Sequence, residues 1–153
     1  VRKDLVGKAP ANTPVYLDYA THAKKGSMYN TPPCYPIYIA GEVFKYLLKN
    51  GGVKATHERD VEKADILYGY LDKSEMFKPS VAKEDRSLMN ITFVTGDPEL
   101  DKKFIAGAKE RGMINLAGYR TVGGMRASTY NAMPLEGVEA LVAYMEKFEN
   151  ENK

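Results

Sequence analysis

The stretch GYRTVGGMRASTYNAMP, residues 118–134, places two arginines on either side of a Gly-Gly pair, just before a predicted helix. A glycine pair favours a bend or bulge in the chain. Residues 125–130 then alternate as in a strand, so that Arg126 shares one face with Ser128 and Tyr130. The stretch therefore predicts a bent segment that leads into a short strand.

Two interpretations of the arginine pair are open from these residues. Positive charge on rigid backbone beside a flexible glycine corner favours an anion-binding site formed by Arg120 and Arg126. Alternatively, both are ordinary surface arginines that pair with nearby acids. A straight strand would hold the two residues about 20 Å apart at ~3.3 Å per residue. A shared anion therefore requires that the chain fold back at Gly123 and Gly124.

The composition is that of an ordinary globular domain, and it excludes some partners. A chain of 153 residues can bury a core, as one domain or as one domain with an appendage. The 22 basic and 20 acidic residues are interspersed, so no basic stripe predicts binding to nucleic acid. No apolar run approaches about 20 residues, and we therefore expect no contact with a membrane.

Cysteine usage and the first residues also bear on the kind of protein. Cys34 is the only cysteine, which excludes an internal disulfide and favours a reducing, cytoplasmic location. No signal peptide is visible. The chain begins at Val1 instead of an initiator methionine, and its first residues resemble the end of a strand that enters a short helix. This start predicts a piece of a longer protein.

The first third of the chain predicts one irregular segment and one helix. Residues 9–31 are rich in turn formers, which predicts a long extended segment with a functional or interface role. Asn30 and Thr31 suit an N-cap and the two prolines after them suit a first turn, so we expect a helix from here to residues 50–52. Its predicted apolar stripe consists of Ile39, Ala40, Val43, Phe44, Leu47 and Leu48.

The rest of the chain predicts a small sheet with helices on one face. A second helix is expected over residues 53–72, with an inward face made of Val53, Ala64, Leu67 and Leu71. There follow a strand at 89–94, a helix capped by Asp97, a strand at 113–117, the Arg126 strand and a helix from Pro134. This order predicts an α+β unit with an antiparallel or mixed sheet.

A second anion-binding candidate lies at the start of the first predicted helix. The free N–H groups and the positive dipole end of a helix N-terminus attract phosphate, which makes Asn30 and Thr31 candidates. A plain N-cap is the alternative. His22 and His57 lack partners at metal-ligand spacing, so no metal site is expected. No glycine-rich loop of the P-loop or dinucleotide-binding type is present.

The chain closely resembles the phosphoserine aminotransferase family in three segments: SMYNTPPCYPIYIAGEVFKYLLKNGG (27–52), RSLMNITF (86–93) and GYRTVGGMRASTYNAMPLEGVEALVAYM (118–145). The resemblance extends over essentially the whole chain. It implies the C-terminal part of a pyridoxal-phosphate-dependent, fold-type I enzyme of the α/β class. Residues 1–51 would be the end of the large cofactor-binding domain with a connecting helix, and residues 52–153 the small C-terminal domain.

The resemblance also implies roles for both anion-binding candidates. The arginine that matches Arg126 binds the substrate α-carboxylate, and the one that matches Arg120 helps to bind the distal phosphate or γ-carboxylate. Tyr119 stands where the family often has histidine, and a phenol can donate a hydrogen bond to phosphate but cannot become positively charged near neutral pH. Asn30 and Thr31 match residues that reach across a homodimer to the cofactor phosphate in the partner subunit.

The reaction that this resemblance implies moves an amino group between L-glutamate and 3-phosphohydroxypyruvate. Its products are O-phospho-L-serine, in serine biosynthesis, and 2-oxoglutarate. The family's Schiff-base lysine lies upstream of the segment that matches Val1, and Lys3 and Lys8 fall beyond its motif. We therefore expect no catalytic residue in this chain, which alone would be inactive and would not retain pyridoxal phosphate. The alternative function is a stand-alone regulatory module that binds a small anionic ligand.

Overall fold

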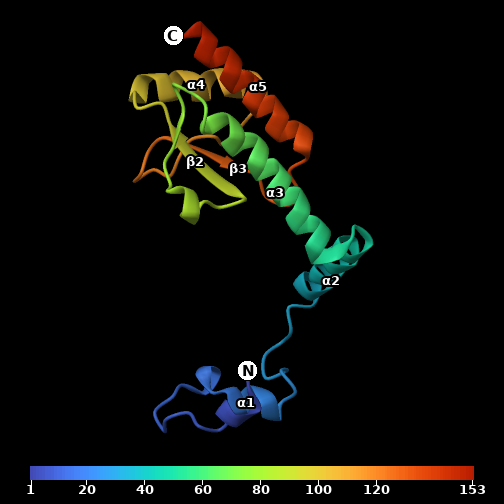
Figure 1. Cartoon of the computed structure of the whole chain (residues 1–153). Helices are drawn as coiled ribbons and strands as arrows, with labels where there is room; N and C mark the ends of the chain where they lie inside the picture. Colours follow the sequence, from blue (N-terminus) through green and yellow to red (C-terminus); the bar gives the residue numbers. More distant parts are fainter. The chain divides into compact units, whose positions relative to one another are not determined.

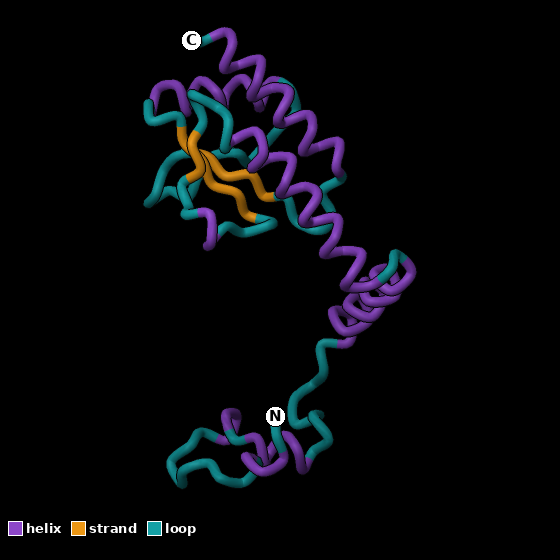
Figure 2. Tube along the Cα trace, viewed as in Figure 1, coloured by secondary structure: helices purple, strands orange, loops and turns teal.

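The computed structural model describes all 153 residues and shows two compact units, Val1–Tyr46 and Leu47–Lys153 (Figure 1). The first unit contains short helices, loops and most of the longer helix α2 (Cys34–Lys49), whereas the second contains the sheet (Figure 2). No helix is both long enough and apolar enough to span a bilayer. The predicted domain boundary between residues 51 and 52 concerns a longer protein and stays a prediction.

The first unit is built from short local turns. The 3-10 helices η1 (Lys3–Leu5) and η2 (Val15–Leu17) are followed by helix α1 (Tyr19–Lys24). Asp18 caps α1, since its Oδ1 accepts a hydrogen bond from the N–H of Ala20 at 3.0 Å. The prediction of an extended segment over residues 9–31 is therefore wrong for its middle part, where a capped turn of helix forms without apolar periodicity.

Helix α2 (Cys34–Lys49) forms close to where the apolar stripe predicts it, but none of its residues is buried. Phe44 is 64% exposed and Leu48 is 76% exposed. No residue of Val1–Tyr46 is buried either, although many large apolar side chains lie there. Large exposed apolar surfaces are typical of regions that contact other protein. This part of the chain therefore has the character of an interface.

The second unit is a three-stranded antiparallel sheet with three helices. Its elements follow in the order α3 (Gly52–Leu71), β1 (Lys78–Pro79), η3 (Lys83–Asp85), β2 (Asn90–Val94), α4 (Pro98–Glu110), β3 (Met125–Ser128) and α5 (Leu135–Glu151). The strand order is β1-β2-β3, with Lys78 opposite Val94 and Thr92 opposite Arg126. The predicted antiparallel sheet with helices is confirmed.

One hydrophobic core joins the sheet to all three helices. Ile91 and Phe93 of β2 and Met125 and Ala127 of β3 form the inward face, and each is at most 2% exposed. The helices add residues at helical spacing: Ala64, Leu67 and Leu71 from α3, Phe104 and Ala108 from α4, and Val138, Leu141, Met145 and Phe148 from α5. The helices therefore cover a single face of the sheet.

One predicted core position and one predicted strand are wrong. Val53 is 85% exposed because it lies in the first turn of α3, whose burial begins only at Thr56. Residues 113–117 form no strand, and only Ala117 makes a single bridge, to Met125. Asn115 has a φ of 62°, a left-handed conformation that interrupts an extended segment.

The third strand of the sheet is β1, which the periodicity does not reveal. It has two residues, pairs with β2 at the edge of the sheet and includes Pro79. Proline is tolerated at a sheet edge because the missing N–H faces outward there. Phe77, just before β1, is fully buried, and its ring centroid lies 5.0 Å from that of Phe104 and 5.9 Å from that of Phe93. A single aromatic anchor therefore fixes this short edge strand.

A buried carboxylate fastens α5 to the turn after α3. Glu149 is 6% exposed. It accepts hydrogen bonds from the hydroxyls of Tyr70 (2.6 Å) and Ser74 (2.7 Å) and from the N–H groups of Glu75 (3.0 Å) and Met76 (3.3 Å). Burial alone would raise the pKa of Glu149, but these hydrogen bonds outweigh burial and lower the pKa to about 2. Burial, together with the hydrogen bond to Glu149, raises the pKa of Tyr70.

Candidate functional site

A closed hairpin joins β3 to the segment before it. The N–H of Gly118 donates to the carbonyl of Gly124 at 2.8 Å, and the N–H of Arg126 donates to the carbonyl of Leu116 at 2.8 Å. A straight strand over residues 120–126 is therefore excluded. The chain folds back at its glycines, as the sequence of residues 118–134 predicts.

The tip of this hairpin holds Arg120. The N–H groups of Val122 and Gly123 both donate to the carbonyl of Tyr119 at 2.8 Å, which closes a tight turn. Gly123 has a φ of 80°, which L-residues rarely adopt. Tyr119 is 66% exposed and Arg120 is exposed as well. Both side chains can therefore meet a ligand from solvent.

The hairpin leaves no room for a side chain at Gly118. A Cβ atom there would lie 2.0 Å from the carbonyl oxygen of Gly123 and 2.8 Å from that of Gly124. We expect Gly118→Ala to break the hydrogen bond between Gly118 and Gly124. Because backbone atoms must move to relieve the clash, the free energy of unfolding should fall by about 1–3 kcal/mol. Urea unfolding followed by circular dichroism measures this change.

Gly69→Ala is the matched control for this substitution. Gly69 lies inside α3 with a helical φ, and a Cβ there would have no neighbour within 4 Å. Alanine favours a helix over glycine by up to about 1 kcal/mol, so this variant should be as stable as the parent or more so. Equal stability of the two variants would show that the hairpin is not closed as described.

Arg126 has no acid partner. Its side chain points to the outer face of the sheet, away from the core, and is half-buried. Its guanidinium makes no hydrogen bond or ion pair, and the Nε atom is buried without a partner. Arg120 likewise makes no ion pair or side-chain hydrogen bond. The interpretation of two arginines paired with surface acids is therefore wrong, and an anionic ligand is favoured.

Thr92, like Arg126, has a buried polar side-chain atom without a hydrogen-bond partner. It lies directly opposite Arg126 on β2, and its Oγ1 is buried without a partner. Leaving a buried polar atom unpaired costs about 1–3 kcal/mol. Asn90 and Ser128, the next opposite pair on this face, add further polar groups. The outer face of the sheet around Arg126 is thus a polar surface whose hydrogen bonds a bound group can complete.

The second anion-binding candidate differs from its prediction. Asn30 and Thr31 are exposed in the first unit, and neither side chain makes a hydrogen bond. Helix α2 begins only at Cys34, so neither residue is its N-cap. A residue that precedes a proline is kept out of the helical conformation, which holds Thr31 and Pro32 outside the helix. The N-cap prediction is wrong, and both polar side chains remain open to a ligand.

The remaining polar groups of the first unit that could carry chemistry have structural roles or none. Asp18 caps α1, and Nε2 of His22 lies 2.7 Å from the carbonyl oxygen of Tyr16. Cys34 is exposed. No group of three or more His, Cys, Asp or Glu side chains is placed to hold a metal ion.

A buried ion pair on α3 lies outside the predictions made from sequence. Lys63 and Asp60 are 3% and 5% exposed, and Nζ of Lys63 lies 3.0 Å from Oδ1 of Asp60. Positions 60 and 63 continue the helical spacing of Leu67 and Leu71. That spacing is the signal that could have placed both charges on the buried face.

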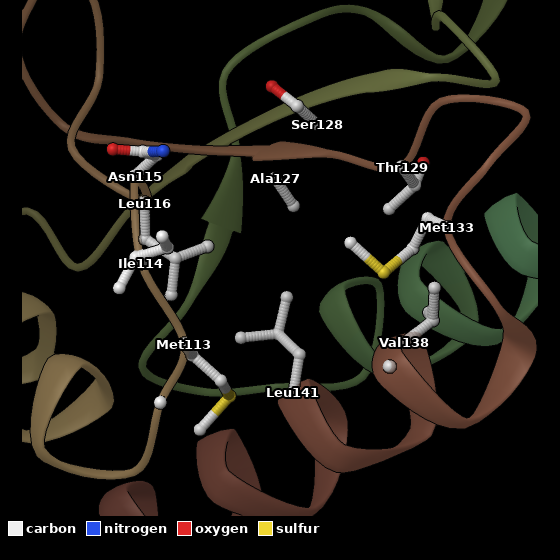
Figure 3. A pocket seen from close by; sticks show the side chains of 12 residues that line it. Met113, Ile114, Asn115, Leu116, Ala127, Ser128, Thr129, Met133, Val138 and Leu141 are labelled. Carbon is white, nitrogen blue, oxygen red and sulfur yellow. The ribbon is translucent and has the colours of Figure 1, made fainter.

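An apolar cavity of about 380 Å³ lies against the core face of β3 (Figure 3). Its lining includes Met113, Ile114, Leu116, Ala127, Thr129, Met133, Val138 and Leu141, and it contains no charged side chain. Ala127 and Thr129 point to the opposite face from Arg126, since side chains alternate along a strand. Most of the lining therefore lies on the other side of β3 from Arg126, and Ser128 alone borders the cavity from the face of Arg126. Without a charged side chain, the cavity does not suit an anion.

Comparison with known proteins shows the family. The chain matches the class-V aminotransferase family over residues 3–141. Phosphoserine aminotransferases from Mannheimia succiniciproducens and Pseudomonas entomophila are each 51% identical to it over 152 residues. Each match covers 99% of this chain and 42% of the relative. The chain thus spans less than half the length of the curated relatives it matches.

Solved structures share the same fold. Phosphoserine aminotransferase from Bacillus circulans subsp. alkalophilus matches with a TM-score of 0.92 and 41% identity over 100% of this chain and 43% of that chain. A pyridoxal-phosphate-bound phosphoserine aminotransferase from Trichomonas vaginalis matches with a TM-score of 0.85 and 37% identity over 95% of this chain and 42% of that chain. Sequence and fold therefore agree that this chain belongs to the class-V aminotransferase family.

Proposed function

We propose that this chain is the C-terminal portion of a phosphoserine aminotransferase. The observation that carries the proposal is a closed hairpin with two arginines, Arg120 and Arg126, neither of which has an acid partner. O-phospho-L-serine and L-glutamate each have two anionic ends, which suit two separate guanidinium groups. The 51% identity to proteins named phosphoserine aminotransferase supports this choice of substrates.

Arg126 would bind the α-carboxylate that both amino acids carry. A guanidinium offers two parallel N–H donors that match the two carboxylate oxygens, so the bound amino acid is fixed in orientation as well as in position. Because Arg126 lies on a strand, its backbone is held by the ladder to β2. Such a rigid support keeps the Cα–H bond of the substrate in a constant direction, which favours a single proton-transfer geometry.

Arg120 and Tyr119 would bind the distal end of the substrate, the phosphate of phosphoserine or the γ-carboxylate of glutamate. Arg120 supplies a permanent positive charge, and the Tyr119 hydroxyl donates a neutral hydrogen bond. Histidine, which relatives often have in place of Tyr119, can add a second positive charge at lower pH. Distal-anion binding in this protein should therefore depend on Arg120 for its charge.

Pyridoxal phosphate, when bound, supplies an electron-withdrawing ring that makes the Cα–H of an amino acid acidic. Asn30 and Thr31 fit its phosphate, because both are exposed and have side-chain donors that make no other hydrogen bond. They would donate to the cofactor phosphate in the partner subunit of a homodimer. No lysine of this chain is assigned to the cofactor, so the chain alone would neither react nor retain it.

The exposed apolar surface of Val1–Tyr46 supports burial against the rest of a longer protein and a second subunit. In that assembly, the amino group of L-glutamate passes to 3-phosphohydroxypyruvate, which gives O-phospho-L-serine and 2-oxoglutarate. This is a step of serine biosynthesis, and we place it in the cytoplasm. The alternative of a stand-alone regulatory module finds no support in the relatives, which are named as enzymes.

The test compares the full-length protein that contains this chain with the chain alone, each mixed with pyridoxal phosphate. With glutamate and 3-phosphohydroxypyruvate, the full-length protein should release 2-oxoglutarate, and the chain alone should not. Borohydride reduction should attach the cofactor to one lysine of the full-length protein and to none within this chain.

Two results would contradict the proposal. One is full-length protein that binds pyridoxal phosphate but transfers no amino group to 3-phosphohydroxypyruvate. The other is stoichiometric attachment of the cofactor at a single lysine within residues 1–153.

Asn30 and Thr31 give a separate prediction. In the full-length protein, replacing both with alanine should weaken retention of pyridoxal phosphate, measured by dialysis and absorbance, and leave the unfolding temperature of the cofactor-free protein nearly unchanged. The reason is that neither side chain makes a hydrogen bond within this chain. Replacement of Ser27 by alanine, an exposed residue of the same loop, is the control. A lower unfolding temperature with unchanged retention would favour a purely structural role.

A further inference from the structure

Lys63 holds the turn that follows the arginine strand. Its ammonium donates hydrogen bonds to three carbonyl oxygens of that turn, those of Thr129 (3.0 Å), Tyr130 (2.9 Å) and Met133 (3.3 Å). The side chain comes from α3, more than 60 residues earlier, and is 3% exposed. A buried lysine whose charge is directed at backbone carbonyls acts on the position of that backbone.

The number of hydrogen atoms on the Lys63 ammonium explains why Oδ1 of Asp60 has no hydrogen bond. An ammonium has three donors, and the three carbonyls take all of them. Oδ1 of Asp60 lies 3.0 Å from Nζ of Lys63 and yet has no hydrogen bond of its own. Asp60 therefore balances the charge of Lys63 without holding its direction. The three carbonyls fix the direction of the Lys63 ammonium, and their hydrogen bonds to it fix the backbone of the turn.

The turn controls the end of the strand that carries Arg126. β3 ends at Ser128, and Thr129 follows it directly. At Thr129 the backbone is held twice, by its carbonyl bond to Lys63 and by its N–H bond to the carbonyl of Met89 at 3.0 Å. A four-residue strand has few ladder bonds, so a fixed end contributes much of its positional precision.

We propose that Lys63 is a positioning residue for Arg126, which it holds in place for the substrate carboxylate through the turn at residues 129–133. The inference rests on the proposed role of Arg126 in substrate binding. A displacement of about 1 Å at a substrate-binding group can reduce activity up to about a hundredfold, even when the chemistry is untouched. Lys63 touches neither substrate nor cofactor and acts only through the backbone.

Two variants of the cofactor-loaded full-length protein separate positioning from simple stability. Lys63→Met leaves the Asp60 carboxylate buried without its counter-charge, so the unfolding temperature should fall by several degrees. The double variant Lys63→Met/Asp60→Leu removes both charges, and its unfolding temperature should recover most of the loss. In both variants the three carbonyls lack their common donor.

The KM values then report on positioning. In both variants we expect KM for phosphoserine and for glutamate to rise about tenfold to a hundredfold, by similar factors, because both substrates use Arg126. Hydrogen exchange of peptides that cover residues 125–134 should accelerate, while the core of α5 stays protected. Lys54→Met, at an exposed lysine of the same helix, should change none of these readouts.

The outcomes distinguish this inference from the proposed function. A double variant with restored unfolding temperature, parental KM and parental exchange at residues 125–134 would reduce Lys63 to a structural role and overturn the inference. If the parent protein shows no aminotransferase activity, the proposed function fails. The exchange rates then still decide whether Lys63 holds the arginine strand, since they require no turnover.

Discussion

Replacement of Arg126 by alanine in the full-length protein is expected to lower kcat/KM for phosphoserine and for glutamate about a hundredfold or more. In the proposed binding mode, the substitution removes two charge-assisted hydrogen bonds to the α-carboxylate, each of about 1.5–3 kcal/mol. Each ~1.4 kcal/mol changes a rate tenfold. Because both substrates carry the same α-carboxylate, the loss should be similar for both.

Arg126→Lys should recover little of this loss. An ammonium keeps the positive charge but has no planar fork, so it cannot hold both carboxylate oxygens at once. It also lacks the Nε–H, which is buried without a partner in this chain and is free to bind a ligand. Steady-state kinetics with each substrate, read as transition-state free energies, provide the measurement. Lys109→Ala, which removes an exposed positive charge from α4, is the control and should leave both values unchanged.

Arg120→Ala should instead lower kcat/KM by different factors for the two substrates. The phosphate of phosphoserine carries more negative charge than the γ-carboxylate of glutamate and loses more when a charged donor is removed. Tyr119, the neighbouring donor, is neutral and cannot replace that charge. We therefore expect a larger loss for phosphoserine than for glutamate. Equal losses on both substrates in both alanine variants would refute the separation of roles between Arg120 and Arg126.

Helices with a one-sided apolar pattern could be predicted from the sequence. The buried faces of α4 and α5 follow the spacing of Phe104 and Ala108 and of Val138, Leu141 and Met145. The cap of α4 could also be predicted, because the side chain of Asp97 accepts a hydrogen bond from the N–H of Glu99, only two residues away. These elements were predictable because each depends on residues within one or two helical turns.

Features that depend on distant contacts or on single backbone angles could not be predicted. The predicted strand at 113–117 fails at Asn115, whose left-handed φ leaves no periodic signal. The edge strand β1 exists because Phe77 is buried among rings that are far away in sequence. The apolar stripe of α2 has the predicted spacing, but none of its residues is buried, so burial could not follow from the pattern alone.

Only part of the arginine site could be predicted from the sequence. The glycine pair and the alternation of residues 125–130 predicted the bend and the face of Arg126. Neither pattern could tell whether an acid pairs with the arginines, because an ion pair forms through space. The three hydrogen bonds of Lys63 could not be predicted from the sequence either, since their acceptors are backbone carbonyls whose positions depend on the turn.

Glu149→Gln is expected to lower the free energy of unfolding at pH 7 by about 3 kcal/mol. The folded-state pKa of Glu149 is about 2, against an ordinary value of 4.5. One pKa unit corresponds to about 1.4 kcal/mol of stability. Since the folded pKa is depressed, this contribution is fully present above pH ~4.5 and disappears as the pH falls toward 2. The stability of the parent and of the variant should therefore converge with acidification.

The geometry explains why an amide cannot replace this carboxylate. Four donors, two hydroxyls and two backbone N–H groups, converge on the two oxygens of Glu149. A glutamine offers one acceptor oxygen, and its NH₂ group would face donors where the second oxygen lies, which leaves buried N–H or O–H groups unpaired. The hydroxyl of Tyr70 can turn to accept from the amide. The Oγ of Ser74 cannot, because it already accepts from the N–H groups of Phe77 (2.8 Å) and Met76 (3.2 Å), and the backbone N–H groups of Glu75 and Met76 can only donate.

Urea unfolding of the 153-residue chain at pH 7, 5, 4 and 3, followed by circular dichroism, measures the difference between parent and variant. Because no residue of Val1–Tyr46 is buried, the cooperative transition reports on the second unit. Glu146→Gln, on the exposed side of the same helix, removes the same charge without these bonds and should differ from the parent by less than about 0.5 kcal/mol. A difference between Glu149→Gln and the parent that stays constant from pH 7 to pH 3 would mean that Glu149 acts by its shape and not by its charge, because only the charged form can lose stabilisation through protonation.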